Sequence, residues 1–458
     1  MSLWHTVELT HTRRFFLLLL AAVTICAAQE DDFRAYTESP RLFLRPQRLR
    51  LLKRERERQS IRWQQLDTLV SGKVPMVEPG FAYALFSRIT GREEYCRQAE
   101  RGMGTDLRQM AIVYDWCQTE RLVPILKQSA DKLAMAKDVP SQRNRALAAI
   151  ALADVDAAWS EKTMRDIIVR WWRGSIVPTL KKGAPLPANS TYALFELLHV
   201  VRDNLNIDLR DQIQGYFRDL PLQHLLSYYP AAFPGAENEF RIPYYAEDGE
   251  PDLKAASLSR AAELAMVAYD SNPVEIQALQ SWLLQDRFLM RGAFGIVYEY
   301  LWANPYQPGI TFHVLPNLFH DKRNGRLFIR SSWEEDATFF CYDQGKAQVF
   351  DAGKRADVNM TAQKKPIRVG MATVIVARDP VEFEIGFSGD TPTEVGEKRP
   401  DETWFVVGLK PNAPYDVEPD SEEMFESSTD SGGIASFQFA KPRVMKYRMH
   451  EPRFPIKK

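Results

Sequence analysis

The 458-residue chain has few cysteines, few histidines and almost no net charge. Four cysteines are too few for the disulfide framework of a small secreted scaffold. The 59 lysines and arginines nearly balance the 60 aspartates and glutamates, giving a formal net charge of -1. This balance excludes a nucleic-acid binder that relies on a basic surface, and it excludes a disordered polyelectrolyte. It leaves a large globular protein of two or three domains.

The common motifs of metal and nucleotide chemistry are also missing. We find no zinc-finger spacing, P-loop, GxSxG elbow or HExxH pair. Five histidines follow residue 28, and no two of them have the spacing of a helical metal pair: His199, His224, His313, His320 and His450. The sequence therefore predicts no metal site and no cofactor.

A continuous apolar run, residues 15–22, lies near the N-terminus. Arg13 and Arg14 precede it, and small residues ending at Ala28 separate it from a polar stretch. These are the three parts of a secretory signal peptide. Even when extended to about 12–14 residues, the run is shorter than the roughly 20 that a membrane span needs. We therefore predict a cleaved signal peptide over 1–28. The mature protein would be exported, either periplasmic or secreted, with no integral membrane segment.

Export changes the expectation for the three cysteines that follow the signal, Cys96, Cys117 and Cys341. An oxidising compartment favours a disulfide. Cys96 and Cys117 form the nearer pair in sequence, and the odd count leaves one thiol free.

Hydrophobic periodicity divides the mature chain into two parts. From about 40 to 305, apolar residues recur at three- and four-residue spacings, which predicts ten to twelve helices arranged in hairpins. After about 310, short alternating segments separated by Gly, Pro and Asp predict strands. We expect an α/α toroid of helical hairpins over 29–310, followed by an antiparallel β-sandwich over 311–458.

Candidate functional residues concentrate between 185 and 250. Asn189 precedes a helix that carries His199, so it is either a helix cap or an amide donor to a ligand. The polar, aromatic stretch 235–249 lies between two helices and contains Glu239, Arg241, Tyr244 and Tyr245. It is either a site wall or a surface loop. Elsewhere, Trp116 is a candidate for substrate binding, with core packing as its alternative.

Three stretches resemble the heparinase II/III-like polysaccharide lyases and their alginate-lyase-like relatives. Residues 39–45, Ser-Pro-Arg-Leu-Phe-Leu-Arg, look like the mature N-terminus of that group. Residues 111–116, Ala-Ile-Val-Tyr-Asp-Trp, are similar to its recurrent Tyr-Asp-Trp helix. Residues 325–333, Gly-Arg-Leu-Phe-Ile-Arg-Ser-Ser-Trp, followed by Asp-Ala-Thr at 336–338, look like the strand pair that opens its β-domain. The likeness covers most of 39–345.

This resemblance implies β-elimination on an acidic polysaccharide or oligosaccharide that contains uronate. Family members use an Asn to neutralise the uronate, with Tyr and His as base and acid. The resemblance assigns the donor to Asn189, the tyrosine to Tyr244 or Tyr245, and the histidine to His199. Glu239 and Arg241 would contact substrate. Such groups supply what the reaction needs, because a neutral donor stabilises the carbanion-like state and a base removes the proton.

One departure from the family pattern is clear. Active relatives carry a His-x-His-x-Asp-like strand after the Ser-Ser-Trp segment, whereas residues 341–357 contain no histidine. Two alternatives therefore remain open. The first is a non-catalytic carbohydrate-binding or scaffold protein on the same fold. The second is a hydrolase that uses Glu237 and Glu239 as a carboxylate pair. The near-zero net charge also counts mildly against a polyanionic substrate.

Overall fold

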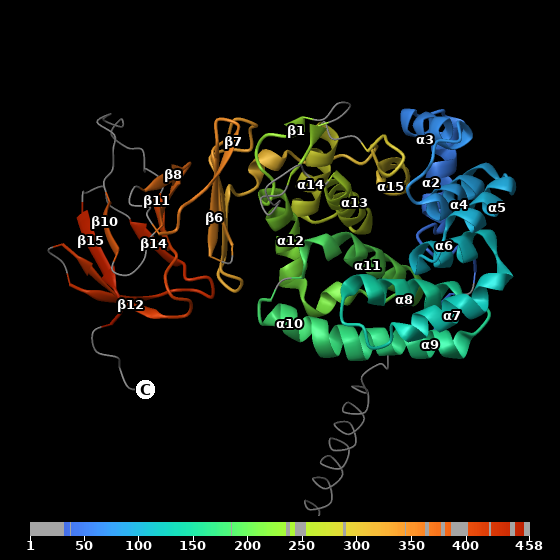
Figure 1. Cartoon of the computed structure of the whole chain (residues 1–458), viewed down its shortest axis with the longest axis horizontal. Helices are drawn as coiled ribbons and strands as arrows, with labels where there is room; N and C mark the ends of the chain where they lie inside the picture. Colours follow the sequence, from blue (N-terminus) through green and yellow to red (C-terminus); the bar gives the residue numbers. More distant parts are fainter. Residues whose placement is uncertain are drawn as a thin grey trace, which may run out of the picture.

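In the computed structural model, helices occupy the first part of the chain and strands the second, in the predicted order (Figure 1). The structure describes residues 32–36, 38–184, 186–234, 239–242, 253–286, 290–343, 345–361, 366–376, 381–385, 402–420, 423–439 and 445–452. The predicted signal peptide lies outside these residues. Within them, no helix is long and apolar enough to cross a bilayer.

The helical part runs from Pro46 to Trp302. Its α-helices are α2 (Pro46–Glu57), α3 (Ile61–Ser71), α4 (Pro79–Thr90), α5 (Glu94–Gly102), α6 (Leu107–Cys117), α7 (Val123–Lys132), α8 (Val139–Ala151), α9 (Ala157–Arg165), α10 (Val177–Lys181), α11 (Thr191–Leu205), α12 (Gln214–Leu226), α13 (Leu253–Tyr269), α14 (Val274–Gln285) and α15 (Gly295–Trp302). A π-helix, η2 (Asp166–Ile176), joins α9 to α10, and short 3₁₀ turns include η3 (Ala188–Ser190) and η4 (Leu209–Gln212).

Local sequence explains many helix starts. The side chains of Ser60, Asp106 and Asp138 accept hydrogen bonds from backbone N–H groups in the first turns of α3, α6 and α8. Such caps satisfy donors that have no partner within the helix. Proline occupies one of the first two positions of α2, α4, α7 and α8, where its missing N–H costs nothing.

Six helices, α4, α6, α8, α11, α13 and α15, form the inside of the helical part. Each contacts the next in this order, and α15 contacts α3 and α4, so that the contacts close into a cycle. In α6, for example, ten residues from Leu107 to Trp116 are buried. We refer to these six as the inner helices.

Strands follow from Leu318 onward and form three sheets. The first has the order β3-β4-β5-β6-β7: β3 (Leu318–Asp321), β4 (Arg326–Arg330), β5 (Phe339–Asp343), β6 (Lys346–Asp351) and β7 (Lys354–Asp357). The second has the order β14-β11-β9-β8: β14 (Ala435–Phe439), β11 (Glu402–Val407), β9 (Ala372–Val376) and β8 (Ile367–Val369). The third has the order β10-β15-β12-β13: β10 (Val381–Ile385), β15 (Met445–His450), β12 (Pro414–Pro419) and β13 (Phe425–Ser428). A two-residue pair, β1 (Phe233–Pro234) and β2 (Glu239–Phe240), lies within the helical part.

Alternating side chains stack these sheets into layers beside the helices (Figure 1). On β4, Phe328 belongs to the helical core, whereas Leu327 and Ile329 pack with the second sheet. On β11, Phe405 faces the first sheet and Trp404 faces the third. The first sheet is therefore buried on both faces, between the helices and the second sheet.

The predicted antiparallel sandwich needs a correction. The first and third sheets are antiparallel throughout their described pairs. In the second sheet, however, β11 runs parallel to β9, with Thr403 opposite Ala372. Parallel neighbours need a crossover connection, and short alternating segments cannot reveal one. The β part therefore contains three stacked sheets, one of them mixed.

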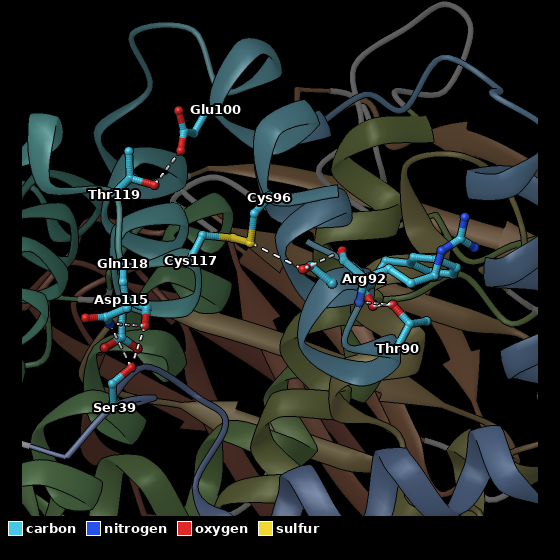
Figure 2. The surroundings of a disulfide bond; sticks show 11 residues. Ser39, Thr90, Arg92, Cys96, Glu100, Asp115, Cys117, Gln118 and Thr119 are labelled. Carbon is cyan, nitrogen blue, oxygen red and sulfur yellow. Dashed lines mark hydrogen bonds between the residues drawn. A yellow bond between two sulfur atoms is a disulfide. The ribbon is translucent and has the colours of Figure 1, made fainter. Parts of the chain in front are cut away.

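A disulfide ties α5 to the end of α6, as the spacing of Cys96 and Cys117 predicted (Figure 2). Beside it, Gln118 adopts a left-handed conformation that ends α6, and its amide donates to the Ser39 hydroxyl over 3.0 Å. The remaining cysteine, Cys341, is free and buried. The end of α6 is thus held covalently on one side and by the N-terminal segment on the other.

We expect reduction of this disulfide to lower the free energy of unfolding by about 3 kcal/mol, because the bond closes a loop of about 20 residues in the unfolded chain. Urea unfolding with and without dithiothreitol measures the loss. The Cys96→Ala/Cys117→Ala variant is the control and should not respond to reductant. Identical curves for oxidised and fully reduced wild-type protein would contradict the expectation.

Candidate functional site

Polar side chains gather where the inner helices begin. Glu78 precedes α4, Arg108 starts α6, and Arg143 lies near the start of α8. Glu196, in the first turns of α11, accepts hydrogen bonds from Nε of Arg108 at 3.0 and 3.1 Å, from Nη2 of Arg108 at 2.7 Å, and from Arg143. These contacts hold the N-terminal ends of the inner helices together on one side of the molecule.

Two phenols complete this network. Tyr192 donates to Glu196 over 2.7 Å, and Tyr298, on α15, donates to Glu78. Burial raises the pKa of both phenols, which therefore stay protonated. Burial, followed by the nearby charge of Arg108, lowers the pKa of Arg143 to about 10, so this guanidinium remains a cation at neutral pH. The network is a buried frame of helix ends, and its tyrosines are not bases.

Asn189 lies at this same end of the helices, on η3, which contacts α11 and α13. Its side chain is exposed, and its amide makes no hydrogen bond within the part of the chain that the structure describes. Ser190, not Asn189, occupies the N-cap position of α11, and its side chain makes no cap bond. The helix-capping alternative for Asn189 is therefore wrong, and the amide is open to a ligand.

The structure places His199 in the core instead of beside Asn189. It is 1% exposed, its Nε2 lies 3.0 Å from the carbonyl oxygen of Ala265, and its ring packs on Trp302 and Tyr269. Burial lowers the pKa of His199 well below its ordinary value, so the ring is neutral. A neutral, enclosed imidazole cannot reach a polymer, so we no longer assign the catalytic acid to His199.

Three other predicted residues, Tyr244, Tyr245 and Glu237, lie outside the described residues. The backbone of Glu239 pairs with that of Pro234. Trp116 is 1% exposed and donates its indole N–H to Leu42 over 2.9 Å, so it packs the core and offers no face to a substrate.

Arg241 is also more enclosed than a substrate contact requires. Its Nε lies 2.9 Å from an oxygen of Asp286, its Nη1 donates to the Pro230 carbonyl, and its guanidinium lies over the ring of Trp282. It nonetheless lines a cavity of about 490 Å³ between the helical part and the first sheet. We call this cavity the junction pocket. Its walls are Pro230, Arg241, Trp282, Gln285, Asp286, Phe312, His313, Trp333, Glu334, Glu335 and Asp336.

Sequence reasoning missed a compact acid–base cluster at the end of α12. The phenol of Tyr228 lies 2.7 Å from Glu263, 2.7 Å from Ser259 and 3.0 Å from Nε2 of His224. His224 also lies 3.0 Å from Glu263. The sequence offered no clear signal for this cluster, because α12 ends at Leu226 and Tyr228 follows its C-cap, while Ser259 and Glu263 lie more than 30 positions away.

This cluster continues toward the junction pocket. Arg260 binds Glu263 at 3.1 Å and Asp286 at 3.3 Å, and Asp286 binds Arg241. Burial opposes ionisation of Glu263, but the hydrogen bond from His224 and the charge of Arg260 outweigh it and lower the pKa of this carboxyl. An ionised carboxylate therefore faces Tyr228 and His224.

The described residues contain no group of three or more His, Cys, Asp or Glu side chains that could hold a metal ion.

Comparisons with known proteins give no family. No family model and no curated protein matches the chain. Ten chains of solved structures match. One of them, described as a glycoside hydrolase, is 8% identical over 82% of this chain and 76% of its own, with a TM-score of 0.23. A likeness at this level carries no argument about activity, so the functional assignment depends on the side chains themselves.

Proposed function

We propose that this chain is an exported polysaccharide lyase that cleaves a uronate-containing polysaccharide by β-elimination. In this proposal the six inner helices are the inner ring of an α/α toroid. The observation that carries it is the exposed amide of Asn189, which makes no hydrogen bond within the described residues. Helix N-termini carry partial positive charge and favour an anion beside them. A uronate carboxylate next to Asn189 would meet both the amide and this field.

The acid–base groups come from the start of α13 and the elements beside it. Asn189 lies on η3, which contacts α13. Ser259, the α13 residue that contacts Tyr228, lies about 9 Å along the helix axis from the first residue of α13. We assign proton transfer to His224, in place of His199, and treat Tyr228, which is 1% exposed, as a residue that positions the His224 ring. Tyr244 or Tyr245, which precede α13 in the chain, is the proposed base at the sugar. Glu263 accepts a hydrogen bond from the Tyr228 phenol over 2.7 Å and lies 3.0 Å from Nε2 of His224, so it holds both side chains in place.

Export is supported by the disulfide between Cys96 and Cys117, because such bonds persist in oxidising compartments.

The alternative to the lyase proposal is a non-catalytic carbohydrate-binding protein on the same fold. Affinity electrophoresis in uronate polymers that are not cleaved would favour that alternative.

Uronate polymers should yield a new absorbance near the unsaturated-uronate band, and Asn189→Ala should lower kcat/KM by about 10²–10³-fold, because the carbanion-like state loses its neutral donor. Asn272→Ala, an exposed amide between α13 and α14, is the matched control and should leave the rate unchanged. Absence of signal on heparan, hyaluronan, alginate and pectate would sink the lyase proposal.

His224→Gln should lower kcat by about 10²-fold or more, because the proposed proton-transfer group is lost. Tyr228→Phe should lower kcat by a smaller factor, because it removes the hydrogen bond that positions His224. It should also lose about 1–3 kcal/mol of stability, since a buried hydrogen bond is removed. Tyr300→Phe controls for that loss: it removes a buried phenol that donates to Leu52 over 2.6 Å, away from the cluster. Equal activity loss in Tyr228→Phe and Tyr300→Phe would mean that Tyr228 is only structural.

A further inference from the structure

Helix α2, at the start of the helical part, concentrates positive charge. Residues 45–58 contain seven lysines and arginines against two glutamates, a net charge of +5 in a chain whose formal total is -1. Figure 1 shows α2 at the end of the helical part opposite the sheets. The near-zero total charge therefore conceals a basic segment that lies away from the junction pocket.

Two of these cations attach the helix to its neighbours. Nη1 of Arg48 donates to the Leu301 carbonyl over 3.1 Å, and its guanidinium lies 4.5 Å from the ring of Trp302, at the end of α15. Nη1 of Arg56 donates to the carbonyl of Ile89, on α4, over 2.6 Å. Both side chains are therefore part of the packing of α2 and are not available to a partner.

The other cations of the helix, with the one at its C-cap, lie on the outward face. Their spacing of three and four residues puts neighbouring Cβ atoms about 5–6 Å apart, over about 12 Å of the helix axis. Four exposed side chains form this face, which we call the α2 stripe: Arg50, Lys53, Arg54 and Arg58. Glu57 is exposed among them, whereas Glu55 is buried and binds Arg62 at 3.2 Å. Four cations and one carboxylate leave the face with a net charge of +3.

The helix alone does not favour this placement of charge. Arg50 and Arg54, like Arg54 and Arg58, are equal charges four residues apart, and such pairs destabilise a helix. The helix dipole favours cations in the last turn, which accounts for Arg54 but not for Arg50 and Lys53. A stripe of Lys and Arg along one helix face attracts polyanions.

We propose that the α2 stripe binds an acidic polysaccharide, outside the candidate functional site. A linear polyanion can lie along the stripe and meet several cations in turn. The apolar side of α2 is buried, as at Leu52, so the helix lacks the exposed apolar face with which amphipathic helices enter a bilayer. The proposal requires binding and no chemical step, so it does not depend on lyase activity. A polymer held at α2 would raise the local concentration of sugar chain around the helical part.

The test is fluorescence anisotropy of a fluorescein-labelled polygalacturonate fragment, titrated with the mature chain at about 50 to 200 mM sodium chloride. All proteins carry Asn189→Ala, so that the lyase activity proposed above does not shorten the probe. Added to this parent, Arg50→Gln/Lys53→Gln/Arg54→Gln should weaken binding about tenfold or more at the lowest salt. It should also reduce the slope of log Kd against log salt by about 2, because three cations no longer displace counter-ions. A labelled dextran fragment is the neutral control and should not bind.

The matched variant is Lys132→Gln/Lys137→Gln/Lys162→Gln, which removes three exposed cations at α7 and α9 and changes the net charge equally. It should bind as the parent does. The stripe variant should unfold at a temperature no lower than the parent, because it removes like-charge repulsion, so lost binding is not lost folding. The proposal is overturned if the parent does not bind polygalacturonate or if both triple variants lose binding equally. It is also overturned if phosphatidylglycerol vesicles bind through the stripe as tightly as the polymer.

Discussion

The buried carboxylate of Asp286 holds together the elements around both candidate sites. It binds Arg241, which fixes the segment after β2, and Arg260, which fixes α13. Breaking a buried ion pair leaves an uncompensated charge and costs about 3–5 kcal/mol. Because Arg260 also binds Glu263, the same carboxylate sets the position of the cluster formed by His224 and Tyr228. The junction pocket and this cluster therefore share one frame.

The same physical rule operates where the inner helices begin. Glu196 is fully buried and is bound by Arg108, Arg143 and Tyr192. Each partner comes from a different turn or helix, so the paired charges specify how the helix ends meet. These side chains are fully engaged with one another. Chemistry at this end is left to groups outside the network, and Asn189 is exposed and makes no side-chain hydrogen bond within the described residues.

The sequence predicted what depends on local pattern. Helical periodicity, short alternating strands and the pairing of Cys96 with Cys117 are all properties of neighbouring residues, and each is confirmed. The sequence could not predict contacts between residues that lie far apart in the chain. His199 appeared functional because it followed Asn189 on a helix, but α11 is buried on nearly every side, and its histidine faces the core. Arg241 appeared exposed because its partner, Asp286, lies 45 positions away. The parallel pairing of β9 and β11 is non-local in the same way.

The position of Arg330 at the end of β4, in the first sheet, distinguishes it from the other buried arginines. Since both faces of this sheet are buried, β4 must present apolar side chains to the helices and to the second sheet, as Phe328 and Ile329 do. Arg330 occupies the next position, and nothing in the packing requires a charge there, because an unbranched apolar chain would cover Trp333 as well. Within the described residues this guanidinium completes no ion pair, and its visible partner is the ring of Trp333.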